Sequence, residues 1–136
     1  MKNRGLIKKD HKISIYLIYV TASIFFLAAT CDKNDLKIIV DAADVTDITA
    51  TSATCGGNVF DDGGAFISAR GVVWAKSAGA TIDSNLGITV DGTGLGSFTS
   101  LLTGLEPATR YYVRAYATNA NGTAYSQQTM TFITLE

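Results

Sequence analysis

The segment Leu105–Gly122, LEPATRYYVRAYATNANG, decides the fold of this chain. It opens with a turn around Pro107, the only proline of the protein, whose ring fixes φ. From Tyr111 to Thr118 the residues alternate with the period of two that is typical of a β-strand. The residues that follow, 119–122 (NANG), include asparagines and a glycine, which tolerate positive φ, and predict a hairpin turn. The segment therefore predicts a turn, one long strand and a hairpin.

The alternation gives this strand two different faces. One face carries Tyr111, Val113, Ala115 and Ala117, and the other carries Tyr112, Arg114, Tyr116 and Thr118. The first face is apolar enough to lie against a core, where the Tyr111 hydroxyl would need a partner from the preceding turn. Such a tyrosine corner occurs in Greek-key β-sandwiches, and we expect it to be formed by Leu105, Pro107, Thr109 and Tyr111.

Residues 44–135 predict further short strands separated by glycine-rich turns. The segments expected to be strands are 45–50, 52–60, 66–76, 97–102 and 123–134, with a short one at 88–90 inside a long loop at 77–96. The small residues Cys55 and Gly57, which share a face, predict a close approach of two sheets, and Gly71 predicts a bulge or a close crossing. About seven strands of this kind predict an all-β, immunoglobulin-like antiparallel sandwich.

The spaced motif from Leu105 to Val113 resembles the second half of a fibronectin type III domain. Further segments resemble the fibronectin type III-like modules of bacterial surface lipoproteins: Gly56–Val59, Ala69–Val72, Gly96–Phe98 and Tyr111–Asn119. The resemblance covers about residues 44–135, and the family has no shared catalytic residues. Vertebrate-type modules carry a tryptophan on the second strand, where this chain has Cys55, and Trp74 falls on the third. We therefore expect the sandwich with a differently arranged core.

The first thirty residues have a different character from the rest. They contain five of the eleven basic residues, all before residue 13, and then an uncharged apolar run of 17 residues, Ile13–Ala29. A basic region, an apolar region and small residues before a cysteine predict a secretion signal helix. Leu27–Cys31 also resembles the lipobox of bacterial lipoproteins, which implies cleavage before Cys31 and acylation of its sulfur. The alternative is an uncleaved membrane anchor, for which the apolar run is at the short limit.

These observations predict the organisation and the location of the protein. We expect a lipoprotein signal peptide at 1–30, a polar tether at 31–43 and the sandwich at 44–135, with the short apolar run at 36–40 as either part of the tether or a lead-in to a strand. The part after residue 30 has six basic and eleven acidic residues, a net charge of −5, which is poorly suited to binding nucleic acid. In some bacterial lipoproteins an acidic run such as Asp32–Asp35 goes with export to the cell surface. We expect an outer-membrane lipoprotein of the cell envelope, held in the membrane by a lipid on Cys31 and exposed at the surface.

Few residues of the chain are suited to catalysis or to metal binding. The only histidine, His11, lies in the signal segment, so neither a Ser-His nor a Cys-His pair exists in the mature protein. Zinc would have at most one thiol ligand, because Cys55 is the only cysteine left if Cys31 is acylated. Cys55 is instead expected to be a small core residue. We expect no cofactor, no metal and no enzymatic activity.

The sequence leaves open what the surface module binds. Tyr112, Arg114 and Tyr116 are of the types enriched in contact surfaces, so we expect them to face outward as a binding face for a protein or a glycan. Ordinary cross-strand pairing of aromatic residues and arginine is the alternative, and it is the commoner arrangement in sandwiches. The main functional expectation is adhesion, or presentation and spacing at the cell surface. The alternative is a glycan-binding accessory module of a surface polysaccharide system, in which these tyrosines and the 77–96 loop would form one concave site.

Overall fold

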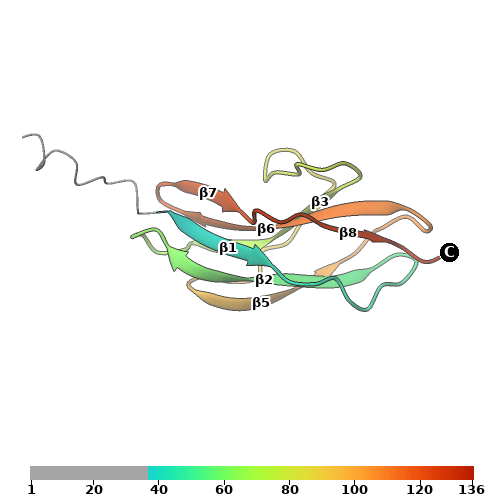
Figure 1. The fold of residues 1–136 in the computed structure, drawn as a ribbon, viewed down its shortest axis with the longest axis horizontal. Coiled ribbons are helices and arrows are strands. Elements are labelled where there is room, and N and C mark those ends of the chain that lie inside the picture. The colour runs from blue at the N-terminus through green and yellow to red at the C-terminus, as the bar shows by residue number, and fades with distance from the viewer. Residues whose placement is uncertain (1–36) are drawn as a thin grey trace, which may run out of the picture. The chain divides into compact units, whose positions relative to one another are not determined.

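The structure, a computed structural model, describes residues 37–136, which form two packed β-sheets (Figure 1). The expected signal helix and Cys31 lie outside the described residues. The strands of the described part are β1 (Ile38–Ala42), β2 (Ala53–Asp62), β3 (Ala69–Ala75), β4 (Gly87–Ile88), β5 (Gly96–Leu102), β6 (Arg110–Asn119), β7 (Gly122–Tyr125) and β8 (Met130–Ile133).

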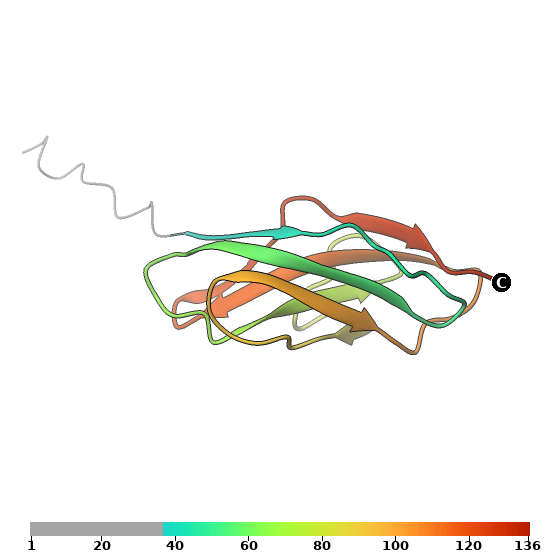
Figure 2. The ribbon, with the colours of Figure 1, turned by 90° about the horizontal axis from the view of Figure 1, so that it is seen from below.

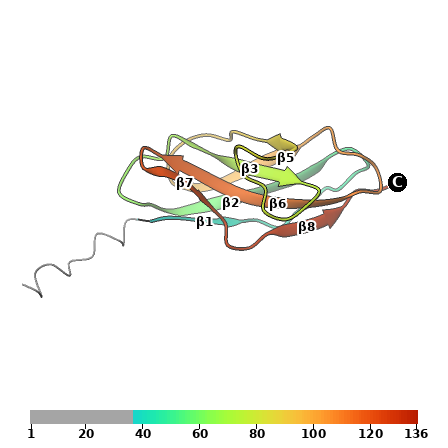
Figure 3. The ribbon, with the colours of Figure 1, turned by 90° about the horizontal axis from the view of Figure 1, so that it is seen from above.

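The two sheets contain three and five strands. The smaller sheet has the order β1-β2-β5, and Figure 2 shows it from its outer side. The larger sheet has the order β4-β3-β6, and both β7 and β8 pair with the far side of β6 (Figure 3). All pairs are antiparallel. The predicted all-β antiparallel sandwich is confirmed, and its seventh strand is divided into β7 and β8.

The division of the last strand is organised by a buried serine. Ser126 lies between β7 and β8 and is fully buried. Its hydroxyl accepts a hydrogen bond from the Ala115 N–H at 3.2 Å and donates one to the Gln128 carbonyl at 2.8 Å. The side chain thus replaces a ladder bond where the backbone leaves the sheet. This is why the single strand expected at 123–134 is two strands in the structure.

The sandwich also begins earlier than the expected boundary at Asp44. β1 pairs with β2 from Ile38 opposite Asp62 to Ala42 opposite Gly57, so these five residues belong to the sheet and not to a tether. The segment expected to be the first edge strand, 45–50, makes only an isolated bridge between Thr46 and Thr54. The alternation in Ile38–Ala42 is only five residues long, so the sequence does not distinguish it from a linker. Its pairing with β2 makes it a strand of the sandwich.

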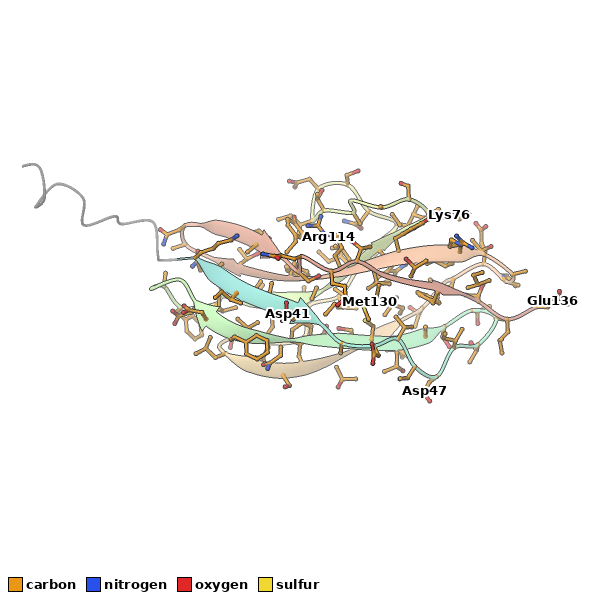
Figure 4. All side chains as sticks on the ribbon, in the orientation of Figure 1. Asp41, Asp47, Lys76, Arg114, Met130 and Glu136 are labelled. Atoms are coloured by element: carbon orange, nitrogen blue, oxygen red, sulfur yellow. The ribbon has the colours of Figure 1, made fainter. Side chains whose placement is uncertain are left out.

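The core lies between the sheets, where side chains from both layers meet (Figure 4). Cys55 is buried in it, as expected, with an exposed fraction of 4%, and Trp74 is buried there too, with an exposed fraction of 6%. A Cβ built on Gly57 would lie 3.0 Å from the Ala115 Cβ of the opposite sheet and 2.9 Å from the Phe98 ring. The predicted close approach of the sheets is therefore confirmed, and it requires a residue without a side chain at position 57.

Candidate functional site

The tyrosine corner is present, and its role is structural. Tyr111 is only 2% exposed, and its hydroxyl accepts a hydrogen bond from the Glu106 N–H at 2.8 Å. Its ring stacks on Phe132 of β8 with 5.8 Å between the ring centroids. Leu105 is buried at the same end of the core. The Tyr111 hydroxyl therefore gives the Glu106 N–H of the turn a hydrogen-bond partner, while the ring packs between the sheets.

The remaining corner residues tie this turn to the end of β8. The Thr134 hydroxyl donates to the Glu106 carbonyl at 2.6 Å and accepts from the Thr109 N–H at 2.9 Å. The Thr109 hydroxyl donates to the carbonyl of Pro107, at 2.9 Å. Between them Ala108 has a φ of 50°, a conformation that a residue with a Cβ rarely adopts. This network explains how a non-glycine residue is held there.

The expected binding face lies on the outer side of the larger sheet, but it is not open. Tyr116 is only 2% exposed, because the connection from β3 to β4, residues 76–86, packs over the sheet. Its hydroxyl donates to the Thr89 carbonyl at 2.6 Å. The sequence placed Tyr116 on a face turned to solvent or to a partner, whereas the chain itself covers this side chain. We call the covering segment, residues 76–86, the β3–β4 loop.

Arg114 and Tyr125 hold the β3–β4 loop from the same side. The Arg114 guanidinium lies over the Tyr125 ring, 4.5 Å from its centroid, and donates to the Ala80 carbonyl at 3.3 Å. The Tyr125 hydroxyl accepts from the Ile82 N–H at 2.9 Å. Figure 4 shows Arg114 on the side of the sheet where the loop lies. The Arg114 guanidinium and the Tyr125 hydroxyl are therefore used within the chain.

Two further features make this cover possible. A Cβ built on Gly71 would lie 2.2 Å from the Thr89 carbonyl oxygen, so only glycine lets this backbone approach β3. The predicted close crossing at Gly71 is therefore confirmed. Val73, Ala80 and Tyr116 form a second, small apolar cluster outside the main core. Of the three residues expected to bind a partner, Tyr112 and Arg114 remain half-buried and Tyr116 is enclosed.

Burial is also visible in the acid–base properties of two side chains. Burial raises the pKa of the Tyr116 hydroxyl, and the nearby Asp91 and Tyr125 add to this. Burial likewise raises the pKa of the Cys55 thiol, an effect that its Gly56 backbone hydrogen bond partly opposes. Both groups stay protonated at neutral pH, and neither has the lowered pKa of a nucleophile.

Arg70 is a central residue that the sequence did not single out. It comes from β3, and its Nη1 donates to the carbonyls of Gly94, Leu95 and Gly96 at 3.1, 2.7 and 3.3 Å. Its guanidinium also lies 5.6 Å from the centroid of the Phe98 ring. One side chain thus fixes a segment in which Gly94 and Gly96 have positive φ. The signal in the sequence is an arginine at an inward position of an otherwise apolar strand.

Hollows and cation-binding groups are sparse in residues 37–136. A hollow of about 460 Å³ is lined by residues 75–80 and 84–86, none of which is aromatic. A smaller one of about 210 Å³ lies beside β1 and is lined by residues 37–41, Tyr125 and Gln127. No group of three His, Cys, Asp or Glu side chains in this range could hold a metal ion. The same range contains no helix that is long and apolar enough to cross a membrane.

The topology and the tyrosine corner together define the class of this domain. The three-stranded sheet packs on a sheet of β3, β6, β7 and β8, to which the short β4 is added beside β3. This arrangement, with Tyr111 hydrogen-bonded to the preceding turn, is a fibronectin type III-like sandwich. No family model and no curated protein sequence matches the chain.

Solved structures of two kinds are similar in fold. The sensor domain of an anti-sigma factor from Pseudobacteroides cellulosolvens has 17% identity and a TM-score of 0.49, over 72% of this chain and 94% of that one. The sixth fibronectin type III domain of a human fibronectin type III domain-containing protein has 24% identity and a TM-score of 0.49, over 70% and 82%. At these values the similarity carries no information on function.

Proposed function

We propose that this protein is a non-enzymatic, membrane-anchored lipoprotein of the cell envelope that presents its fibronectin type III-like module at the outer face of the outer membrane. The observation that carries the proposal is the lipobox-like segment Leu27–Cys31 placed only six residues before the first described residue, Lys37, of a self-contained sandwich. A lipid on Cys31 would hold the chain in the bilayer, with about 0.8 kcal/mol for each buried methylene.

The geometry favours presentation and spacing over adhesion through the expected binding face. β1 begins beside Asp62, whereas β8 ends beside Arg110, so the chain enters and leaves at opposite ends of the sandwich (Figure 1). β6 runs between these ends with ten residues, a length of about 33 Å. A domain built in this way holds whatever lies at its far end at a fixed distance from its near end.

The alternative as a glycan-binding module is less well supported by the arrangement of residues 37–136. It required Tyr112, Tyr116 and the 77–96 loop to form one concave aromatic site. Tyr116 is instead buried under that loop, and the larger hollow has no aromatic side chain in its lining. On a glycan array we therefore expect no sugar-dependent signal that Tyr112→Ala removes.

Intact mass of the protein extracted from membranes tests the proposed function. We expect a chain that begins at Cys31 and carries added acyl mass. The variant Cys31→Ser should lose the acyl mass and leave the lipoprotein fraction, while its sandwich unfolds at the same temperature as before. A mass equal to the full, unmodified 136-residue chain would refute acylation and favour the uncleaved anchor.

A further inference from the structure

The end of the sandwich where β1 begins carries an exposed apolar rim. Four large side chains at this end are at least half exposed: Ile39 at 50%, Phe60 at 58%, Phe66 at 68% and Leu95 at 53%. They include both exposed phenylalanines of residues 37–136. We call these four residues the near-end rim. Exposed aromatic side chains gathered at one end of a domain mark a surface that contacts a partner or a membrane.

The register shows that these residues are neighbours. Ile39 pairs with Asp61, the residue after Phe60. The pairing of β2 with β5 ends at Val59 opposite Gly96, so the next residues along the two strands are Phe60 and Leu95. A Cβ built on Gly94 would lie 4.0 Å from the Phe66 ring. The rim is therefore continuous across β1, β2 and the segments that follow β2 and precede β5.

The rim is also held in place by internal hydrogen bonds. The Gly94 N–H donates to the Ile67 carbonyl at 2.9 Å, and Ile67 itself is fully buried. Arg70 fixes the carbonyl of Leu95 at 2.7 Å. Phe66 and Leu95 thus project from backbone that is tied to the core, and their exposure does not come from a loose loop.

We propose that the near-end rim docks on the lipid surface of the membrane that holds the acylated Cys31, and this rests on the proposed function. Cys31 precedes Lys37 by six residues, which span at most about 20 Å when fully extended. The sandwich is about 33 Å long, so a tether of this length keeps the rim end next to the bilayer. Aromatic and aliphatic side chains suit the boundary between headgroups and acyl chains.

The charges near the rim indicate which lipids it accepts. Asp61 and Asp62 lie beside it, and their carboxylates accept hydrogen bonds from the Gly63 and Gly64 N–H groups. The basic side chains at this end are the exposed Lys37 and the half-buried Arg70, which balance the two carboxylates. Anionic lipid would not attract this end, so docking depends on apolar contact and needs only neutral, zwitterionic lipid.

Depth-dependent quenching on the acylated mature chain tests this proposal. The chain is placed in vesicles of phosphatidylethanolamine and phosphatidylcholine that contain spin-labelled lipid. An environment-sensitive fluorophore is attached at Asn121→Cys, in the exposed near-end hairpin, or at Thr103→Cys, exposed at the far end. We expect quenching about threefold greater at 121 than at 103, because the near end sits at the interface. Equal quenching at both positions would overturn the proposal.

Matched variants separate the rim from the tether. The double change Phe60→Ser and Phe66→Ser should lower the quenching at 121 by about half or more, whereas Leu101→Ser with Leu135→Ser, equally exposed at the far end, should leave it unchanged. A Gly/Ser insertion of about twenty residues after Asp35 should keep the quenching at 121 above that at 103. If quenching at 121 and at 103 becomes equal after the insertion, the short tether alone kept the near end close to the bilayer, and the rim proposal is wrong.

Failure of the rim proposal and failure of the proposed function give different results. A chain without acyl mass at Cys31 contradicts the proposed function. An acylated, vesicle-bound chain with equal quenching contradicts only the rim proposal. Concentration-dependent cross-linking through position 66 without lipid quenching would assign the rim to a second copy of the chain, which also overturns lipid docking.

Discussion

The change Tyr111→Phe tests the physical basis of the fold most directly. It keeps the ring that stacks on Phe132 at 5.8 Å and removes only the oxygen that accepts from the Glu106 N–H. The amide then loses its partner in a part-buried turn, which costs about 1–3 kcal/mol. A fibronectin type III-like domain of this size has about 5–15 kcal/mol of stability in total, so the loss is easily measured.

The assay is urea unfolding of the chain from residue 31 with Cys31→Ser, which removes the acylation site. Unfolding is monitored by tryptophan fluorescence. Trp74 is the only tryptophan and is buried in the core, so its emission reports loss of the sandwich. A loss of about 1.5 kcal/mol corresponds to a shift of about 1 M in the urea midpoint, with an unchanged slope. The melting temperature should fall by about 6 °C or more.

The control for this prediction is Tyr112→Phe on the next residue. Tyr112 is half-buried, and its hydroxyl makes no hydrogen bond within residues 37–136, so the change should stay within about 0.5 kcal/mol. If Tyr111→Phe destabilises the protein no more than Tyr112→Phe does, the corner hydrogen bond is not what holds the turn. The role given to Tyr111 would then be refuted.

The other predictions concern the covered face, the thiol and one glycine. Tyr116→Phe removes the hydrogen bond to the Thr89 carbonyl just after β4, so β4 and the β3–β4 loop that leads into it should be cut faster by protease, with a loss of about 1 kcal/mol. Because the Tyr116 pKa is raised, the stability that its neutral form provides is complete below about pH 10 and is lost as the pH rises through the folded-state pKa. Urea titrations from neutral to alkaline pH should therefore show a shallower alkaline loss of stability in Tyr116→Phe than in the wild type. Cys55 is 4% exposed with a raised pKa, so the folded protein should react with an alkylating reagent far more slowly than the urea-unfolded protein, as mass spectrometry would show. Gly87→Ala places a Cβ 2.0 Å from the Trp74 ring, so it should cost about 1–3 kcal/mol by thermal melting and change the Trp74 emission.

Each of these predictions has an outcome that contradicts it. Equal protease rates in Tyr116→Phe and the wild type would mean that the loop is held by other contacts, and an identical alkaline profile would mean that Tyr116 does not titrate as described. Rapid alkylation of the folded protein would place Cys55 at the surface. For Gly87→Ala the control is Ala78→Gly in the exposed part of the loop, and equal melting of both variants would show that β4 does not pack tightly on Trp74.

The sequence alone determined the parts of the fold that are local in the chain. The turn at Pro107 and the alternation from Tyr111 to Thr118 involve neighbouring residues, whose preferences act wherever the strand lies. The hydroxyl of a buried tyrosine needs a partner, and the nearest backbone is that of the same turn. For this reason the corner and the sandwich class could be predicted from a single segment.

Only the tertiary structure decided which surfaces remain open. The alternation shows that Tyr116 and Arg114 share a face, but it does not show that residues 76–86 return to cover that face. This cover depends on contacts between segments 25 to 45 residues apart, such as Arg114 with Ala80 and Tyr125 with Ile82. The near-end rim has the same origin, since Ile39, Phe60 and Leu95 become neighbours only through strand pairing. Local preference sets the faces of a strand, and long-range packing decides which of them water can reach.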